Sequence, residues 1–493
     1  MKILIETLVQ IITVLIKGVF DLIGLVFSMN KNDRLHQDSP MSGVDKWFVF
    51  YCFHKGLVVN GKKRISTKQT LTHALIVGKS GIGKTSAFYL PNLLRAKTQS
   101  FVVTDLDGAM YKASSGYLKK QGYDIQVLDF ANVQQSAFFN PIAFCNSEDD
   151  LKSLAENIVF SSDVSKNSQD NFWSYSSSHL LYFLLRLVKT QEECYQNLSN
   201  VRHLLNLMET QGFKEFISEN VEGILFSDYL SFHSKDVKLR TNIQASLSAI
   251  IDLFTYSEIA HITAQNTLDF ALLTKPKSVL FVIVPEKKLK NYALILSLFY
   301  TKLFGYVQEN PPKQPVRFLL DEAGNFYIKD LEILLSILRR YNCSLSLGLQ
   351  DLSQLKNLYG DQASKTIINN TSTKIIFPGA SLELATEISR ISGQKTVDIL
   401  FEGKTNQQTK SVFTVTEIIQ MPQNKALFLI SNHAPVMLKM HPYYKQYFSL
   451  KRRSKLKPIA REETFMIPPV LMPIHHSKNP THEKTQPTTS PVY

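Results

Sequence analysis

The chain has 493 residues, of which 44% are hydrophobic and 11% aromatic, and its 55 Lys and Arg against 42 Asp and Glu residues leave a net charge of +13. This apolar content excludes a chain that is disordered throughout, and the length allows two or three domains. The basic excess is typical of proteins with polyanionic partners, such as nucleic acid or an anionic membrane surface, although a solubilising charge surplus gives the same sum.

The N-terminal region contains an apolar run at residues 8–27, interrupted only by a few polar positions such as Lys17 and Asp21. As a helix this run is long enough to cross a bilayer core of about 30 Å, and the two charges, four positions apart, can pair on one helix face. Basic residues follow the run, which places the rest of the chain in the cytoplasm by the positive-inside rule. We expect a membrane segment at 1–28 and a polar linker at 29–46; an amphipathic or core helix is the alternative.

Strand and helix patterns alternate in two separate parts of the chain, with clear strands at 101–105 and 123–130. Such alternation predicts a parallel sheet with helices on both faces. Long helical patterns with few strand signals separate the two parts. The sequence therefore predicts one α/β domain formed by residues 47–150 and 273–448, with an all-alpha domain inserted at 151–272.

The C-terminal region, residues 449–493, differs again in composition. It begins with the basic run 451–461 and continues with a stretch rich in Pro and Thr. Such a composition does not build a packed core and predicts a disordered tail. The basic run is compatible with contact to nucleic acid or acidic lipid, and a solvated tail is the alternative.

Residues 78–85 satisfy the pattern G-x-x-x-x-G-K-[ST] in full, between an apolar strand and a helical pattern. In such a loop the glycines let backbone N–H groups wrap a phosphate chain. Lys84 is expected to reach the β and γ phosphates of ATP, and the Thr85 hydroxyl to bind Mg²⁺. The predicted nucleotide-binding residues are Gly78, Lys79, Ser80, Gly81, Ile82, Gly83, Lys84, Thr85 and Ser86.

Two further strand ends carry polar side chains that suit the same chemistry. The run VRFLLDE ends in Asp321, a candidate ligand for Mg²⁺, and Glu322, a candidate base for the attacking water. Gln350 ends the apolar run SLSLGLQ and is a candidate contact for the γ-phosphate or its water. Arg339 and Arg340 end a predicted helix, where they either complement the helix dipole or act as an arginine finger on a neighbouring subunit. Spacing alone leaves both interpretations open.

From about residue 57 to 440, the order of these motifs resembles the TraG/TraD family of type IV coupling proteins, the ATPases of conjugation. The segments that carry the resemblance are HALIVGKSGIGKTSAFYLPNLL, FFNPIAF, NFWSYSS, FLLDEAGNF, LGLQDLSQLKNLYG and IINNTSTKIIFPG. The chain departs from the family after the second strand, where residues 104–109 read TDLDGA in place of a pattern like TDPKGE. It also has one imperfect apolar segment where many relatives have two.

The resemblance implies a RecA-like P-loop ATPase domain that carries an inserted helical domain, is anchored in the cytoplasmic membrane and assembles as a homo-hexamer. By implication, its cofactors are ATP and Mg²⁺, and its partners are relaxase-bound DNA and the proteins of a type IV secretion channel. Carried over to this sequence, the family's catalytic roles fall on Lys84, Glu322, Gln350 and Arg340. Its magnesium ligands fall on Thr85 and Asp321.

The function expected from the motifs and the resemblance is ATP-driven coupling of conjugative DNA to a secretion channel, with the helical domain recognising the cargo. One alternative is a double-stranded DNA translocase of the segregation or packaging type, which would share the ATPase core. Another is a non-hydrolysing membrane receptor for the transfer substrate. The acidic pair Asp321 and Glu322 favours a hydrolase over the receptor.

Overall fold

The computed structural model describes Phe50 and residues 55–162, 171–401, 404–463 and 468–474. The predicted membrane segment 1–28 and linker 29–46 lie outside these ranges. Within the described part of the chain, no helix combines the length and the apolar character that crossing a bilayer requires.

The centre of the molecule is a nine-stranded sheet with the order β11-β10-β7-β1-β6-β5-β2-β4-β3. The strands from β3 to β7 in this order are parallel, and β10 and β11 add an antiparallel edge. Their bounds are β1 Ala74–Val77, β2 Ser100–Leu106, β3 Asp124–Asp129, β4 Ser278–Val284, β5 Val316–Leu320, β6 Cys343–Leu349, β7 Thr373–Ile376, β10 Lys425–Ile430 and β11 Val436–Lys439. The predicted α/β class is confirmed.

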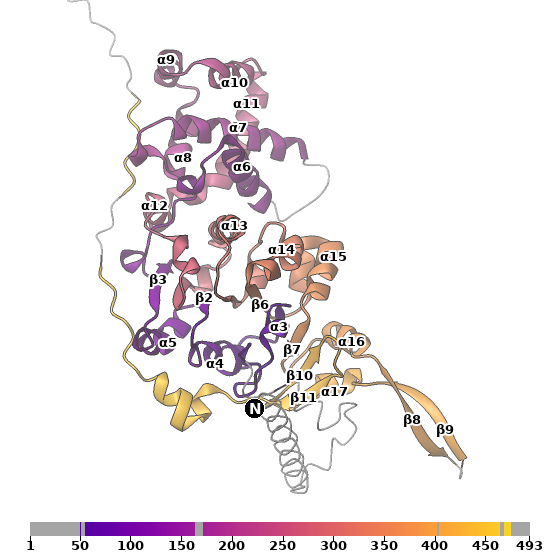
Figure 1. Ribbon diagram of the computed structural model, residues 1–493. Helices are drawn as coiled ribbons and strands as arrows, with labels where there is room; N and C mark the ends of the chain where they lie inside the picture. The colour runs from indigo at the N-terminus through magenta and orange to yellow at the C-terminus, as the bar shows by residue number, and fades with distance from the viewer. Residues whose placement is uncertain (1–49, 51–54, 163–170, 402–403, 464–467, 475–493) are drawn as a thin grey trace, which may run out of the picture.

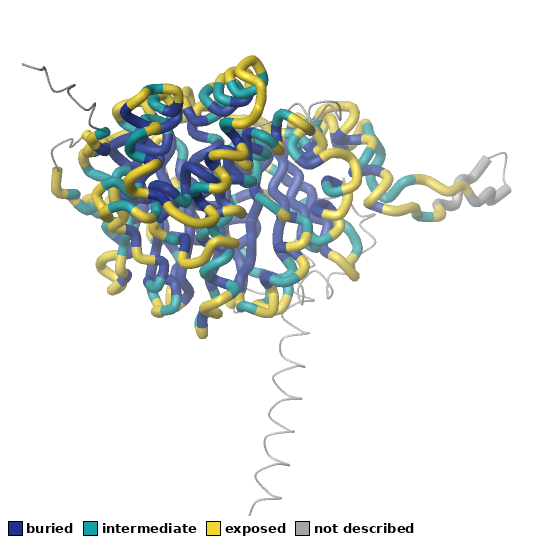
Figure 2. The backbone as a smooth tube through the Cα atoms, turned by 90° about the horizontal axis from the view of Figure 1, so that it is seen from above, coloured by how far each residue is buried: buried dark blue, intermediate teal, exposed yellow. Residues whose placement is uncertain are grey.

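Helices cover both faces of the sheet, because its apolar strands present side chains to both sides. In β2, Val102 packs into one apolar core and Phe101 and Val103 into the other. On one face lie α3 (Thr67–Thr70), α4 (Leu90–Leu93) and α5 (Ala109–Lys120), and on the other α13 (Ala293–Glu309), α14 (Leu331–Ile337) and α15 (Ser353–Asn370) (Figure 1). Figure 2 shows the strands as the buried centre of the molecule.

Between β3 and β4 the chain forms a helical layer that lies beyond α13 (Figure 1). Its α-helices are α6 (Glu148–Ser162), α7 (Asn171–Lys189), α8 (Leu198–Leu207), α9 (Gln211–Asn220), α10 (Gly223–His233), α11 (Val237–Ile251) and α12 (Ser257–Thr263). Leu180, Leu184 and Leu187 of α7 recur at helical spacing and are buried. They belong to the same continuous apolar core as one face of the sheet, so the helical layer packs directly on the α/β domain.

A two-stranded sheet of β8 (Gln394–Phe401) and β9 (Lys404–Ser411), which sequence analysis did not predict, projects from the body of the molecule (Figures 1 and 2). It is connected through α16 (Leu382–Ile391) and α17 (Val415–Ile419) to the β7–β10 side of the main sheet.

The prediction of a disordered tail at 449–493 is wrong for the part that the structure describes. The turn Tyr447–Lys451 is helical and Leu450 is fully buried. Arg453 donates to the carbonyl of Leu94 at 2.6 Å and lies over the Tyr117 ring. Arg453 is therefore held by a carbonyl and an aromatic ring of the α/β domain, which composition does not reveal. The segment then runs along the domain toward the helical layer (Figure 1).

Arg461 anchors this segment to the end of β3. Its guanidinium pairs with the Asp129 carboxylate at 2.6 Å, donates to the carbonyl of Gln135 and lies over the ring of Tyr111. The Asp129 side chain is only 3% exposed, so water contributes little to its solvation.

We expect the substitution Arg461→Ala to lower the free energy of unfolding by about 3 kcal/mol, because it leaves a buried carboxylate without its cation. Chemical denaturation of the full chain measures this change. The matched control is Arg390→Ala, which removes an ion pair with Glu387 in which both side chains are exposed. The control is expected to leave the unfolding curve unchanged; equal curves for both variants would contradict a structural role for Arg461.

Candidate nucleotide-binding site

The predicted motifs meet at one edge of the sheet, where parallel strands end side by side. β6 lies between β1 and β5. The glycine-rich loop follows β1, Asp321 and Glu322 follow β5, and Gln350 follows β6. Because neighbouring parallel strands have the same direction, segments that are far apart in the sequence converge at this edge.

Glycine is required at several positions of the loop for two different reasons. Gly81 and Gly83 have φ angles of 77° and 104°, in a region that other residues rarely adopt. A Cβ atom on Gly78 would lie 2.6 Å from the Cβ of Phe377, so there the constraint is space. The loop leads into the helical turn Thr85–Tyr89, whose N-terminus attracts anions.

Thr85 and Asp321 place two oxygen atoms together, as a magnesium site needs. The Thr85 hydroxyl donates to the Asp321 carboxylate at 3.0 Å. Burial raises the pKa of Asp321 to about 6, and Lys84 opposes this rise. Hydroxyl and carboxylate oxygens are suitable donors for Mg²⁺, so this pair fits the metal that the loop motif implies.

Glu322 is the centre of a hydrogen-bonded network. One carboxylate oxygen is 3.2 Å from Nζ of Lys84, and the other accepts from Nε2 of Gln350 at 2.9 Å and from Nδ2 of Asn325 at 3.3 Å. Lys84 also donates to the Gly78 carbonyl at 2.6 Å. The structure thus brings the lysine, the acid and the glutamine together and adds Asn325. The only sign of Asn325 in the sequence is its position three residues after Glu322.

The network borders a cavity of about 360 Å³ between the loop and the ends of β2, β4 and β5. The predicted nucleotide-binding residues line it, except Gly78 and Ile82; Ile82 packs against an apolar core. Asp105, Asp107 and Glu286 also line the cavity, and sequence analysis did not assign them to the site. The sequence does contain a sign of them, because each is an acidic residue at the end of a buried strand or just after it.

Asp105 holds the start of α5 against the cavity. Its carboxylate accepts from the backbone N–H groups of Met110 and Tyr111 at 2.9 and 2.6 Å. Burial nevertheless raises its pKa to about 7, and these two bonds oppose the rise. Asp105, the aspartate at the second position of the TDLDGA segment, therefore has a structural role: it helps to form the wall of the cavity.

Arg340 lies far from this network within the same chain. It is exposed in the turn Leu338–Tyr341, which precedes β6, whereas Gln350 follows the end of that strand. A strand of seven residues at about 3.3 Å each separates the two positions. Arg340 therefore does not belong to the network of its own chain.

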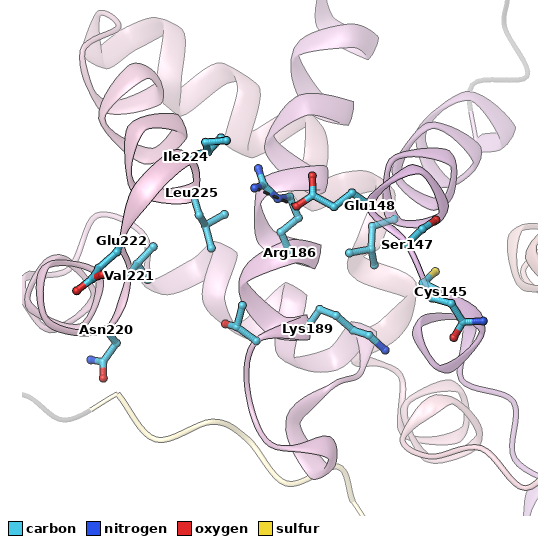
Figure 3. A pocket seen from close by; sticks show the side chains of 13 residues that line it. Cys145, Ser147, Glu148, Arg186, Lys189, Asn220, Val221, Glu222, Ile224 and Leu225 are labelled. Carbon is cyan, nitrogen blue, oxygen red and sulfur yellow. Dashed lines mark ion pairs between the residues drawn. The ribbon is translucent and has the colours of Figure 1, made fainter.

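A larger cavity of about 500 Å³ lies inside the helical layer (Figure 3). Arg186 of α7 crosses it, with ion pairs to Glu148 at 3.3 Å and to Asp228 at 2.8 Å. Cys145, Lys189 and Leu225 also line its wall. None of the predicted site residues contributes to this cavity, so it is separate from the nucleotide site.

Gly348 of β6 leaves space for Asp321, and we expect Gly348→Ala to disturb the site. A Cβ atom there would clash with the Tyr89 hydroxyl and lie 2.9 Å from Oδ1 of Asp321. We expect a loss of about 1–3 kcal/mol in the free energy of unfolding and weaker binding of Mg-nucleotide. Denaturation and nucleotide titration measure the two effects. The control is Gly305→Ala on α13, where a Cβ meets no atom within 4 Å; the prediction fails if both variants bind nucleotide as the wild type does.

The chain is similar to known proteins of conjugation and type IV secretion. The chain is similar to the type IV secretion system-coupling protein VirD4 of Bartonella henselae, with 22% identity over 79% of this chain and 66% of the relative. It is also similar to the conjugal transfer protein TraG of Rhizobium radiobacter, with 21% identity over 69% of this chain and 54% of TraG. The chain thus spans about half to two thirds of the length of these relatives.

Among solved structures, the plasmid coupling protein TrwB in complex with ADP and Mg²⁺ has a similar fold, with a TM-score of 0.66 and 16% identity over 82% of this chain and 94% of TrwB. The family model described as type IV secretory system conjugative DNA transfer matches residues 28–466. Because this match covers most of the sequence, the chain belongs to the type IV secretory system conjugative DNA transfer family.

Proposed function

We propose that the chain is an ATP-hydrolysing coupling protein that brings relaxase-bound DNA to a type IV secretion channel and drives conjugative transfer. The observation that carries this proposal is the network of Lys84, Glu322 and Gln350 beside the Thr85–Asp321 pair, in a member of the conjugative transfer family. A passive receptor has no need of a buried carboxylate held between a lysine and an amide.

Each residue of the network has a defined task in hydrolysis. Backbone N–H groups of the loop and Nζ of Lys84 would bind the phosphates, and Thr85 and Asp321 would hold Mg²⁺, which supplies neutralisation of phosphate charge when bound. Glu322 accepts the proton of the attacking water, and Gln350 fixes the orientation of that carboxylate. This division of tasks supports ATP hydrolysis rather than nucleotide binding alone.

The proposal extends to assembly and location. Arg340 is exposed and remote from its own site, which suits an arginine finger that completes the site of the next subunit in a homo-hexamer. Residues 1–28 would anchor the ring in the cytoplasmic membrane, with the ATPase domain in the cytoplasm. The net charge of +13 favours phosphate contacts with the transferred strand, which weaken as salt rises.

DNA-stimulated hydrolysis by the purified full chain tests this function. We expect the rate of ATP hydrolysis to rise on addition of single-stranded DNA. We expect this stimulation to fall as the salt concentration rises from about 50 to about 200 mM, because phosphate contacts that release counterions weaken over this range. Stimulation by duplex DNA alone would favour the double-stranded translocase. Absence of hydrolysis with either nucleic acid would contradict the proposal and favour the receptor.

A further inference from the structure

The helical layer holds a stretch of the C-terminal segment, residues 468–474, through its backbone. Asn200 of α8 is fully buried, and its side chain donates to the carbonyl of Val470 at 2.9 Å and accepts from the N–H of Met472 at 2.8 Å. Nε2 of His203 lies 3.2 Å from the carbonyl oxygen of Met472. Two side chains thus form hydrogen bonds with three main-chain groups. Hydrogen bonds of this kind hold an extended peptide whatever its side chains are.

Alternate side chains of the segment face the helical layer. Met472 is only 4% exposed and belongs to the apolar core of the helical layer, and Ile474 packs against that core. The neighbouring Val470 and Leu471 are 54% and 51% exposed. The two apolar side chains that face the core, Met472 and Ile474, are thus two positions apart, as expected for an extended conformation.

The groove is larger than the segment that occupies it. A cavity of about 470 Å³ remains between the segment and the helices, lined by residues such as Arg202, Phe254 and Ser257 on one side and by Pro468, Pro469 and Leu471 on the other. This space opens to solvent beside the half-exposed Val470 and Leu471, so the segment fills only part of its groove. The fit is that of an exchangeable ligand.

The segment is also tethered, which explains why it occupies the groove although it fills only part of it. Arg461 fixes the chain to Asp129, only seven residues before Pro468. Tethering of this kind gives an effective concentration of the order of millimolar, so a weak ligand in the same chain fills the groove.

We propose that the groove formed by Asn200, His203 and the Met472 pocket is a docking site for an extended, proline-containing apolar peptide. In the resting chain the ligand is the chain's own segment 468–474. When this segment leaves the groove, a segment of the same chemistry from a partner protein takes its place. While docked, the segment ties the helical layer to the α/β domain through Arg461. The proposal does not depend on ATP hydrolysis or DNA transfer.

A synthetic fluorescent peptide of residues 468–474, PPVLMPI, tests the proposal against the full chain. The variant Met472→Asp removes the buried anchor of the chain's own segment and leaves the groove intact. We expect the peptide to bind this variant at least tenfold more tightly than the wild type, because the tethered competitor is gone. The matched control is Val470→Asp, at an exposed side chain, which should bind the peptide as weakly as the wild type does.

Groove variants show whether the peptide binds at the proposed place. In the Met472→Asp chain, Asn200→Ala or His203→Ala should weaken peptide binding at least tenfold. Because Asn200 is fully buried and also contacts Asn197, His203→Ala decides the question if the first variant does not fold. Equal binding to wild-type and Met472→Asp chains, or binding that persists in His203→Ala, would overturn the proposal.

Discussion

Replacing Glu322 by Gln is expected to lower ATP hydrolysis about 10²–10⁴-fold, the range found when a general base is removed. The amide is similar in size and can still contact Gln350 and Asn325, which now hold the carboxylate at 2.9 and 3.3 Å. It cannot accept a proton from water, so the chemical step slows while nucleotide still binds. Steady-state hydrolysis at saturating ATP, together with titration of a fluorescent nucleotide, separates the two effects.

The matched control is Glu286→Gln, which changes an acidic residue on the wall of the same cavity. Glu286 has no described contact with Lys84, so hydrolysis is expected to stay within about threefold of the wild type. If Glu322→Gln retained the wild-type rate, Glu322 would be only a partner that positions Lys84. Equal losses in the two variants would indicate a general effect of negative charge in the cavity.

The sequence predicted the parts of the site that depend on local pattern. The loop at 78–85 needs glycine at fixed spacing, and Asp321, Glu322 and Gln350 follow apolar strands, so their meeting at one sheet edge follows from the parallel order. Strand order itself was not predictable, because pairing is decided by packing between distant segments. Asn325 was missed for the same reason, since its role depends on how the turn after β5 folds back on Glu322.

The C-terminal segment shows where composition misleads. A run rich in basic residues and proline has no core of its own, and by itself it predicts disorder. Its order comes from partners more than 250 residues away, Asp129 for Arg461 and Asn200 for the backbone of Val470 and Met472. A single sequence contains no signal for such pairs, because each partner alone is an ordinary polar residue.

Replacing Lys84 by Ala is expected to lower hydrolysis at least 10²-fold and also to weaken nucleotide binding, which distinguishes it from the change at Glu322. Nζ is buried between the Gly78 carbonyl and Glu322, and Lys84 lines the cavity that would hold the phosphates. Its loss removes the cation that meets the β and γ phosphates, where charge builds up in the transition state. Nucleotide titration and steady-state hydrolysis of the purified full chain measure both changes.

The control for Lys84→Ala is Lys79→Ala, which removes an exposed positive charge from the same loop and cavity. If net charge alone attracted the nucleotide, the two variants would lose affinity equally; we expect a large loss only at position 84. Because Lys84 and Glu322 form an ion pair, the double variant Lys84→Ala with Glu322→Gln should lose less than the product of the single losses. Fully multiplicative losses would show that the two side chains act independently and would refute the network as the catalytic unit.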